Sequence, residues 1–213
     1  MKNFIALIKS LTSKTHERLG KILIEKSLQI STAESCTGGL LSSRLTDVSG
    51  SSAYTKTNFI TYSNEAKSTI LGVNENIIEK YGAVSEQCAY EMAAGLIKKT
   101  KCDIAVCTTG IAGPMRSRCD AGIDSLPRVE QGRTLRWHRC EQSDSGVSEA
   151  IFDCTGAYLD KTVGLIYISV AFKGKITVKQ FKLNPEYNRK NMKFMFTEKA
   201  LKMTLDIIKN YQG

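Results

Sequence analysis

The sequence predicts an α/β fold: a single layered α/β/α domain with a mixed central sheet. Runs of residues with strand periodicity alternate with runs of helical periodicity along the chain, which is typical of helices packed on both faces of one sheet. A length of 213 residues and a hydrophobic fraction of 42% fit one globular domain with a core. Two glycine turns, "AESCTGG" and "TTGIAGP", each follow a predicted strand, and such strand ends usually bind ligands in α/β sheets.

The individual elements follow from periodicity and from end signals. Helical spacing predicts helices over residues 4–28, 38–48 (starting near Thr37), 64–73, 85–100 and 188–211. Strand patterns cover residues 29–35, 56–63, the run from Cys102 into "TTGIAGP", and 163–172 with 175–183, a hairpin about "KGK". Asn64 and Ser85 are the expected N-caps of their helices, and Gly72 is an expected helix end.

Composition excludes several classes of protein. No run of eighteen apolar residues is present and no secretory leader is evident, so we expect a cytoplasmic protein without a membrane span. Seven cysteines, an odd number, argue against a disulfide framework.

The net charge of +9 is consistent with nucleic-acid binding. The lysines are spread along the chain, however, so a basic surface that attracts anionic ligands is the favoured interpretation.

Residues 115–160 differ in composition from the rest of the chain. They hold six arginines and no lysine, whereas the remainder holds twenty-one lysines and three arginines. We interpret this segment as an insertion into the domain. Its Cys119, His138, Cys140 and Cys154 match no common zinc spacing, so no metal site is expected.

Two adjacent residues of "TAESCTGG", Ser35 and Cys36, are candidate nucleophiles. A side chain at a strand-to-helix turn lies near free backbone N–H groups that can stabilise an oxyanion, and Gly38 and Gly39 allow a tight turn. The alternative is a serine-rich helix start without chemistry. Spacing alone does not decide between these interpretations.

The candidate base is a lysine. The histidines, His16 in the first helix and His138 in the insertion, are poor partners for a Ser-His-Asp triad. Lys67 in "YSNEAK" stands at the start of a helix that follows a predicted strand, where partial burial would lower its pKa enough to accept a proton. A solvated surface lysine is the alternative.

"TAESCTGGLLSSRLTDVSGSSAY", "YSNEAK", "LGV", "YGAVSE", "TTGIAGP" and "VGLIYISVA" resemble, in order and spacing, the CinA C-terminal domain family, also called nicotinamide-nucleotide amidases. The resemblance covers about residues 11–114 and 161–210. It implies one amidase domain over residues 1–213 that deamidates nicotinamide mononucleotide to nicotinic acid mononucleotide and ammonia, without metal or cofactor. Larger members carry an additional N-terminal domain, so we expect only the amidase part. Family members are commonly homo-oligomers, which we expect here too.

The resemblance also implies roles for individual residues. The nucleophile falls on Ser35, the base on Lys67, and Tyr62 assists them, while Arg189 would suit the 5′-phosphate. Substrate contacts are implied for eight residues: Glu34, Thr37, Gly38, Ser52, Thr109, Gly110, Gly113 and Arg189.

The sequence departs from the family after "GIAGP". A short glycine-rich loop ending in Lys-Pro-Val-Gly is usual there, whereas here residues 115–160 intervene and the end reads "KTVG", with Thr162 in place of proline. The rival hypothesis is therefore a catalytically impaired binding or regulatory protein linked to competence or the DNA-damage response. Direct nucleic-acid binding, which rests on net charge, is the third hypothesis.

Overall fold

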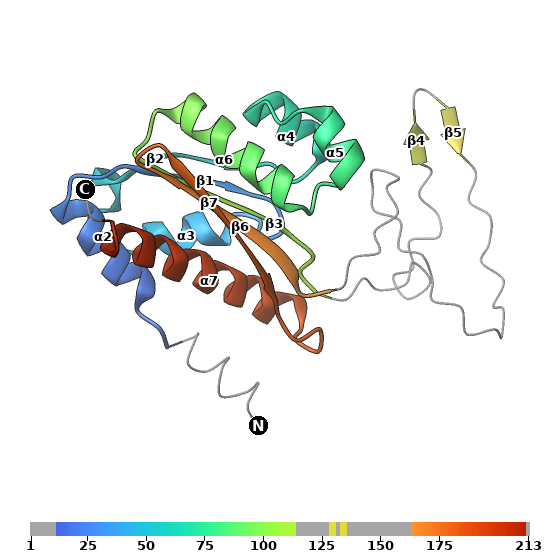
Figure 1. Ribbon diagram of the computed structural model, residues 1–213. Coiled ribbons are helices and arrows are strands. Elements are labelled where there is room, and N and C mark those ends of the chain that lie inside the picture. The colour runs from blue at the N-terminus through green and yellow to red at the C-terminus, as the bar shows by residue number, and fades with distance from the viewer. Residues whose placement is uncertain (1–11, 114–127, 131–132, 136–162, 212–213) are drawn as a thin grey trace.

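A five-stranded mixed sheet forms the centre of the molecule (Figure 1), confirming the predicted fold class. The structure is a computed structural model and describes residues 12–113, 128–130, 133–135 and 163–211. The strands lie in the order β2-β1-β3-β6-β7. Their bounds are β1 Ile30–Glu34, β2 Thr55–Ile60, β3 Ile104–Gly110, β6 Leu165–Phe172 and β7 Lys175–Lys182.

The three strands on one side of the sheet are parallel. β1 pairs with β2 and with β3 in parallel register, so Glu34 lies beside Ile60 and Thr108. β6 and β7 complete the sheet as antiparallel strands, forming the predicted hairpin. Because β1, β2 and β3 run in the same direction, their carboxyl ends meet at one edge of the sheet. This edge is the expected position of a binding site.

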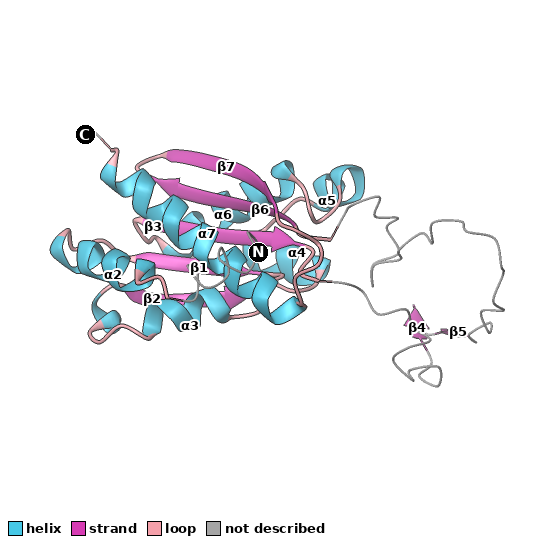
Figure 2. Ribbon diagram, turned by 90° about the horizontal axis from the view of Figure 1, so that it is seen from below, coloured by secondary structure: helices cyan, strands magenta, loops and turns pink. Residues whose placement is uncertain are grey.

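Helices cover both faces of the sheet, as Figures 1 and 2 show. One layer consists of α4 Asn64–Leu71, α5 Glu75–Tyr81 and α6 Glu86–Thr100, and the other of α2 Thr15–Glu25, α3 Leu40–Thr46 and α7 Arg189–Lys209. All five residues of β1 are buried because it is central and covered on both sides.

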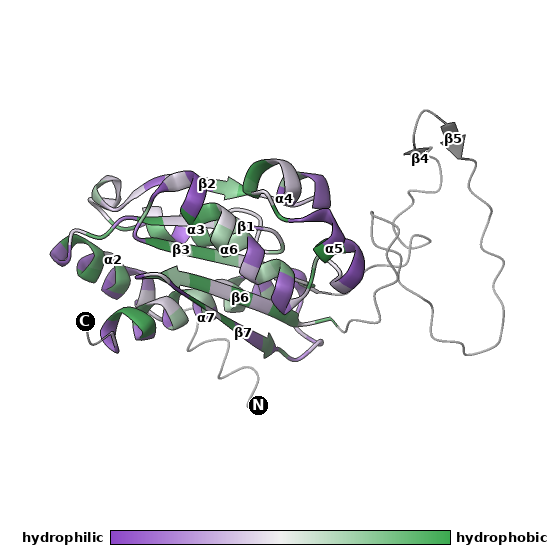
Figure 3. Cartoon of the chain, turned by 45° about the horizontal axis from the view of Figure 1, so that its top comes forward, coloured by the Kyte–Doolittle hydropathy of each residue, from purple (hydrophilic) through white to green (hydrophobic). Residues whose placement is uncertain are grey.

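The hydrophobic core has two halves, one on each face of the sheet. Leu19, Leu45 and Phe196 pack in the half beneath α2, α3 and α7. Leu71 and Met92 pack in the half beneath α4 and α6. In Figure 3 the inner strands carry many hydrophobic residues, whereas hydrophilic residues alternate with hydrophobic ones along the helices. Burial on both faces is the main stabilising contribution to this layered arrangement.

The structure corrects several predicted boundaries. The helix expected near Thr37 begins at Leu40, because Gly38 and Gly39 have φ values of +60° and +89°, which a right-handed helix does not contain. The N-cap of α4 is Ser63 rather than Asn64, since the Ser63 hydroxyl accepts the Ala66 N–H. α5 was not predicted.

Other predicted ends are confirmed. Ser85 caps α6, and Gly72 ends α4 with a φ of +72°. Of the helix expected over residues 4–28, the structure describes α2, and residues 1–11 lie outside its described part.

The inserted segment lies mostly outside the described residues. Within it the structure describes one antiparallel strand pair, β4 Arg128–Glu130 with β5 Arg133–Leu135. The four residues considered as zinc ligands, Cys119, His138, Cys140 and Cys154, are outside the described part. Of the helices that are described, none combines the length and apolar character that a membrane span requires.

Candidate active site

Ser35 is the first residue after β1, at the edge where the parallel strands end. Its N–H donates to the carbonyl of Thr108 on β3 (3.0 Å), and the hydroxyls of Thr37 and Thr108 lie 2.8 Å apart. These bonds fasten the turn after β1 to the neighbouring strand. Ser35 is 9% exposed, so its hydroxyl has a fixed position and limited access to solvent.

Lys67 lies in the first turns of α4 and is 1% exposed. Its Nζ lies 3.3 Å from Ser35 Oγ. It also contacts three successive carbonyl oxygens, those of Thr61 (3.1 Å), Tyr62 (3.2 Å) and Ser63 (3.4 Å). The structure thus brings the predicted serine and lysine together as a hydrogen-bonded pair.

Glu34 does not face the open side of the site. It is fully buried, and its carboxylate accepts the N–H groups of Gly39, Leu41 and Ser42 at 2.8–3.0 Å, together with the Ser42 hydroxyl at 2.5 Å. A carboxylate at a helix start satisfies donors that otherwise lack partners. Glu34 therefore holds the turn that presents Ser35, and its oxygens are already occupied.

Backbone N–H groups of the same turn remain available. Gly38 N–H donates to the Ser35 carbonyl at 3.1 Å. Within the described part of the chain, the N–H groups of Cys36 and Thr37 make no hydrogen bond to another residue. Two adjacent N–H groups beside a candidate nucleophile form the type of arrangement that stabilises a developing oxyanion.

Cys36 is 4% exposed and lies within the first core half. Burial above all raises the pKa of its thiol to about 12; the nearby Glu34 charge adds to this rise, whereas its own backbone N–H, Lys67 and Arg189 oppose it. The thiolate is the reactive form of cysteine. At neutral pH Cys36 is therefore a protonated core residue, and of the two adjacent candidates only Ser35 has the surroundings of a nucleophile.

Arg189 and Tyr62 form one side of the site. Arg189 Nη1 donates to the Ala112 carbonyl at 2.5 Å, and Nη2 donates to the Tyr62 hydroxyl at 3.1 Å. Gly113 is needed here, because a Cβ on it would lie 2.8 Å from Arg189 Cα and its φ is +93°. The start of α7 is thus placed against the turn that follows β3. Tyr62 remains 57% exposed.

Thr109 and Gly110 end β3 beside this turn. Thr109 is 1% exposed, and its hydroxyl donates to the Ala83 carbonyl at 2.7 Å. Gly110 lies so close to β6 that an added Cβ would be 2.6 Å from the Leu165 carbonyl oxygen. Both residues lie at the expected edge, and Gly110 is required there for packing.

Ser52 is the exception among the expected site residues. It lies in the short helix η1 Ser51–Ala53 that precedes β2, so it is at the amino edge of the sheet. Five to six strand residues, about 17–20 Å, separate that edge from Ser35. Within one chain the fold therefore does not bring Ser52 to the site. Ser52 precedes β2 and Tyr62 follows it, so the two lie at opposite ends of the strand although they are close in sequence.

Two residues near the site were not predicted. Lys193 on α7 places its ammonium beside Gly38, 3.1 Å from where a Cβ would lie. The spacing of four from Arg189 could have indicated it, since residues i and i+4 share a helix face. Thr61 is fully buried, and among the described residues its hydroxyl has no hydrogen-bond partner. Its place directly after β2 could have indicated Thr61, whose N–H donates to the Glu34 carbonyl at 2.8 Å.

Comparisons with known proteins show which family the chain resembles. The model of the CinA C-terminal domain family matches residues 12–123. A nicotinamide-nucleotide amidohydrolase PncC of Enterobacter agglomerans is 41% identical over 133 residues, which cover 62% of this chain and 81% of that protein. A CinA-like protein of Chlorobium limicola is 54% identical over 110 residues, 52% of this chain.

The crystal structure of the competence/damage inducible protein CihA from Agrobacterium tumefaciens has the same fold. Its TM-score is 0.69 at 27% identity, and the match covers 92% of this chain and 94% of that one. The Chlorobium match, in contrast, covers only 26% of the relative. The chain therefore spans about a quarter of the length of that larger relative.

Proposed function

Because the chain belongs to the CinA C-terminal domain family, we propose that it is an amidohydrolase that converts nicotinamide mononucleotide to nicotinic acid mononucleotide and ammonia. The observation that carries the proposal is the 3.3 Å contact between Lys67 Nζ and Ser35 Oγ. The N–H groups of Cys36 and Thr37, which follow Ser35 in the same turn, make no hydrogen bond to another described residue. The relative named as a nicotinamide-nucleotide amidohydrolase supports the choice of substrate.

The first half of the reaction is acylation of the serine. Lys67, as the neutral amine, accepts the Ser35 proton while Oγ attacks the carboxamide carbon. The N–H groups of Cys36 and Thr37 hold the developing oxyanion. As the C–N bond breaks, the Lys67 ammonium returns its proton to the leaving nitrogen, which departs as ammonia. Ser35 then carries the nicotinoyl group as an ester.

The second half is hydrolysis of this ester. A water molecule attacks the carbonyl carbon, and Lys67 takes a proton from it. The bond between the carbon and Ser35 Oγ breaks, and Oγ regains a proton from Lys67. The product is the carboxylate of nicotinic acid mononucleotide.

The remaining residues would bind and orient the nucleotide. Arg189 suits the 5′-phosphate, since a guanidinium can donate two parallel hydrogen bonds. Tyr62, held by Arg189, would guide the substrate towards Ser35. Thr109 would accept a hydrogen bond, because its proton is used by Ala83. Glu34 acts through the backbone of the turn. A cytoplasmic location, a homo-oligomer and independence of metal remain predictions.

A specific observation favours a second candidate, a binding or regulatory protein without turnover. Gly113, which contacts Arg189, directly precedes the part of the chain where residues 115–160 interrupt the family pattern. A small displacement of binding groups lowers catalytic rates by large factors. This candidate predicts nucleotide binding without product.

Product identification distinguishes the two candidates. Purified protein is incubated with nicotinamide mononucleotide, and nucleotides are separated by chromatography while ammonia is measured in parallel. The amidase yields equal amounts of nicotinic acid mononucleotide and ammonia. Release of free nicotinamide would indicate cleavage of the glycosidic bond instead, and saturable binding without product would support the second candidate.

A further inference from the structure

The packing of α7 places Lys193 next to the turn that follows β1 and contains Ser35 and Gly38. It lies four residues after Arg189, so the two cationic side chains share one face at the start of the helix. Its Nζ lies over Gly38, where an added Cβ would be only 3.1 Å away and where φ is +60°. Glycine at position 38 therefore leaves the space that the Lys193 side chain occupies. Ser35 is three residues before Gly38 in the same turn.

Among the described residues, no acidic side chain pairs with Lys193. The first turn of α7 contains no acidic residue, unlike those of α4, α5 and α6, which contain Glu65, Glu75 and Glu86. Cations are unfavourable at the positive end of a helix and next to a like charge at i+4. In the described part of the chain, Lys193 has no carboxylate within ion-pair distance.

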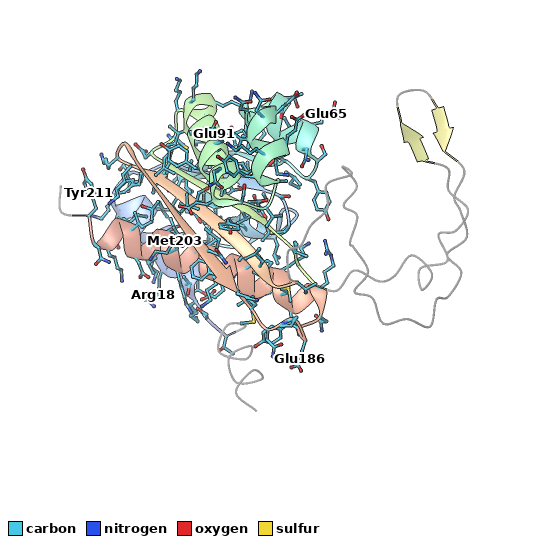
Figure 4. The ribbon with its side chains drawn as sticks, turned by 45° about the vertical axis from the view of Figure 1, so that its right-hand side comes forward. Arg18, Glu65, Glu91, Glu186, Met203 and Tyr211 are labelled. Atoms are coloured by element: carbon cyan, nitrogen blue, oxygen red, sulfur yellow. The ribbon has the colours of Figure 1, made fainter. Side chains whose placement is uncertain are left out.

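Two acidic side chains of neighbouring segments are already engaged. Glu186, which precedes α7 and is labelled in Figure 4, accepts a hydrogen bond from the Asn184 side chain at 3.0 Å. The carboxylate of Glu34 is fully used by the turn after β1. An anionic ligand would therefore compensate both Arg189 and Lys193.

We propose that Lys193, together with Arg189, binds the phosphate of the substrate and makes the enzyme select phosphorylated amides over unphosphorylated ones. This rests on the proposed function, because it places the amide of the same molecule at Ser35. In a mononucleotide the ribose separates the amide-bearing ring from the phosphate. Lys193 is suitably placed, since Gly38 separates it from the Ser35–Lys67 pair. The ammonium supplies a point charge, while the Arg189 guanidinium supplies directed hydrogen bonds.

The test compares two substitutions on the same helix turn, Lys193→Met and Lys190→Met. The ratio kcat/KM is measured for nicotinamide mononucleotide and for nicotinamide riboside, which lacks the phosphate. Lys193→Met is expected to lower kcat/KM for the mononucleotide about 10- to 100-fold, mainly through KM, and to leave the riboside unaffected. Lys190→Met, which removes an exposed lysine, should change neither value. Equal losses on both substrates, or no loss with the mononucleotide, would overturn the proposal.

Failure of the proposed function is distinguishable from failure of this inference. If the parent protein turns over neither substrate, binding of nicotinamide mononucleotide to the parent and to Lys193→Met is compared by calorimetry. Binding about tenfold weaker or more in the variant supports the phosphate role without any catalysis. Equal binding to both proteins, or no binding to the parent, overturns it.

Discussion

Cys36 and Ser35 are neighbours in the chain but differ in chemical state. Burial raises the pKa of the Cys36 thiol to about 12, so at about pH 8 the folded protein holds it protonated and iodoacetamide should not label it within hours. In the unfolded chain its pKa is about 8.5, and labelling should become rapid in denaturant. Peptide mass spectrometry with and without denaturant checks this. Rapid labelling of native Cys36 would contradict its assignment as an inert core residue.

The buried hydroxyl of Thr61 yields a prediction about stability. Because this hydroxyl has no partner among the described residues, removing it should release a desolvation cost. Thr61→Val should therefore leave the free energy of unfolding unchanged or raise it by up to about 1 kcal/mol. Urea denaturation measures this.

Thr204→Val is the matched control for Thr61. Thr204 is also buried, but its hydroxyl donates to the Ala200 carbonyl at 2.8 Å. Its substitution should lower the free energy of unfolding by about 1 kcal/mol. If Thr61→Val proved the more destabilising of the two, the Thr61 hydroxyl would have a partner in the folded protein.

At the level of residues, the sequence predicted the candidate Ser35–Lys67 pair but not its surroundings. Spacing made Ser35 and Lys67 candidates, because each follows a predicted strand, but their roles came from the resemblance to the CinA C-terminal domain family. The structure brings the two side chains within 3.3 Å. The role of Glu34 could not, because a carboxylate next to a nucleophile is equally consistent with substrate binding and with helix capping. The position of Lys193 depends on how α7 packs against the turn after β1, which no local pattern describes.

The element that shapes the site most is α7, and a buried ion pair holds it against α3. Arg44 Nη2 on α3 lies 2.7 Å from Glu198 on α7, and both side chains are almost fully buried. Arg44 also donates to Thr197 and stacks on the Phe194 ring. Since α7 carries Arg189 and Lys193, this network positions the cationic side of the site.

The Glu198 carboxylate makes the stability of this contact dependent on pH. Burial alone would raise its pKa, but hydrogen bonds from Arg44, Thr15 and Lys202 hold the pKa below its usual value. The contribution is therefore present above the unfolded value of about 4.3 and is lost as the pH falls below it. Glu198→Gln should lower the free energy of unfolding by about 3 kcal/mol at pH 7, since it leaves Arg44 buried without its anion.

Urea denaturation of the parent and of Glu198→Gln, at pH 7 and at about pH 3.5, checks this prediction. The difference in the free energy of unfolding between the two proteins should be smaller at the lower pH. A difference that stays constant would mean that the charge of Glu198 does not contribute.

Element predictions succeeded where periodicity and capping agreed. The Ser85 cap, the β6–β7 hairpin and the long last helix are confirmed. α5 was missed because its seven residues, Glu75–Tyr81, contain too few apolar positions to show a helical period. The start of α3 was misplaced because the two glycines at positive φ lengthen the turn before it.

At the scale of the whole molecule, residues 115–160 join two strands that are already adjacent. Ile111 N–H donates to the Leu165 carbonyl and Gly164 N–H to the Ile111 carbonyl, at 2.8 and 2.9 Å. A short glycine linker could therefore replace the segment without strain. Shortening the connection roughly eightfold should raise the free energy of unfolding by about 2 kcal/mol. Thermal or urea denaturation of the deletion variant checks this, and a less stable variant would show that the segment contributes to folding.

The layered fold itself was predictable as a whole, because alternating strand and helix periods leave few arrangements that bury both faces of a sheet. The placement of Ser52 was not. It depends on which end of β2 faces the site, and this follows only from the parallel pairing of β1 with β2.

The central claim is that the Ser35 hydroxyl attacks the substrate. It is tested most directly by the initial rate of ammonia release from nicotinamide mononucleotide, measured side by side for the parent protein, Ser35→Ala and Cys36→Ala. We expect a loss of about 10⁴-fold or more for Ser35→Ala and a rate close to that of the parent for Cys36→Ala. Ammonia release by Ser35→Ala at the parental rate would contradict it.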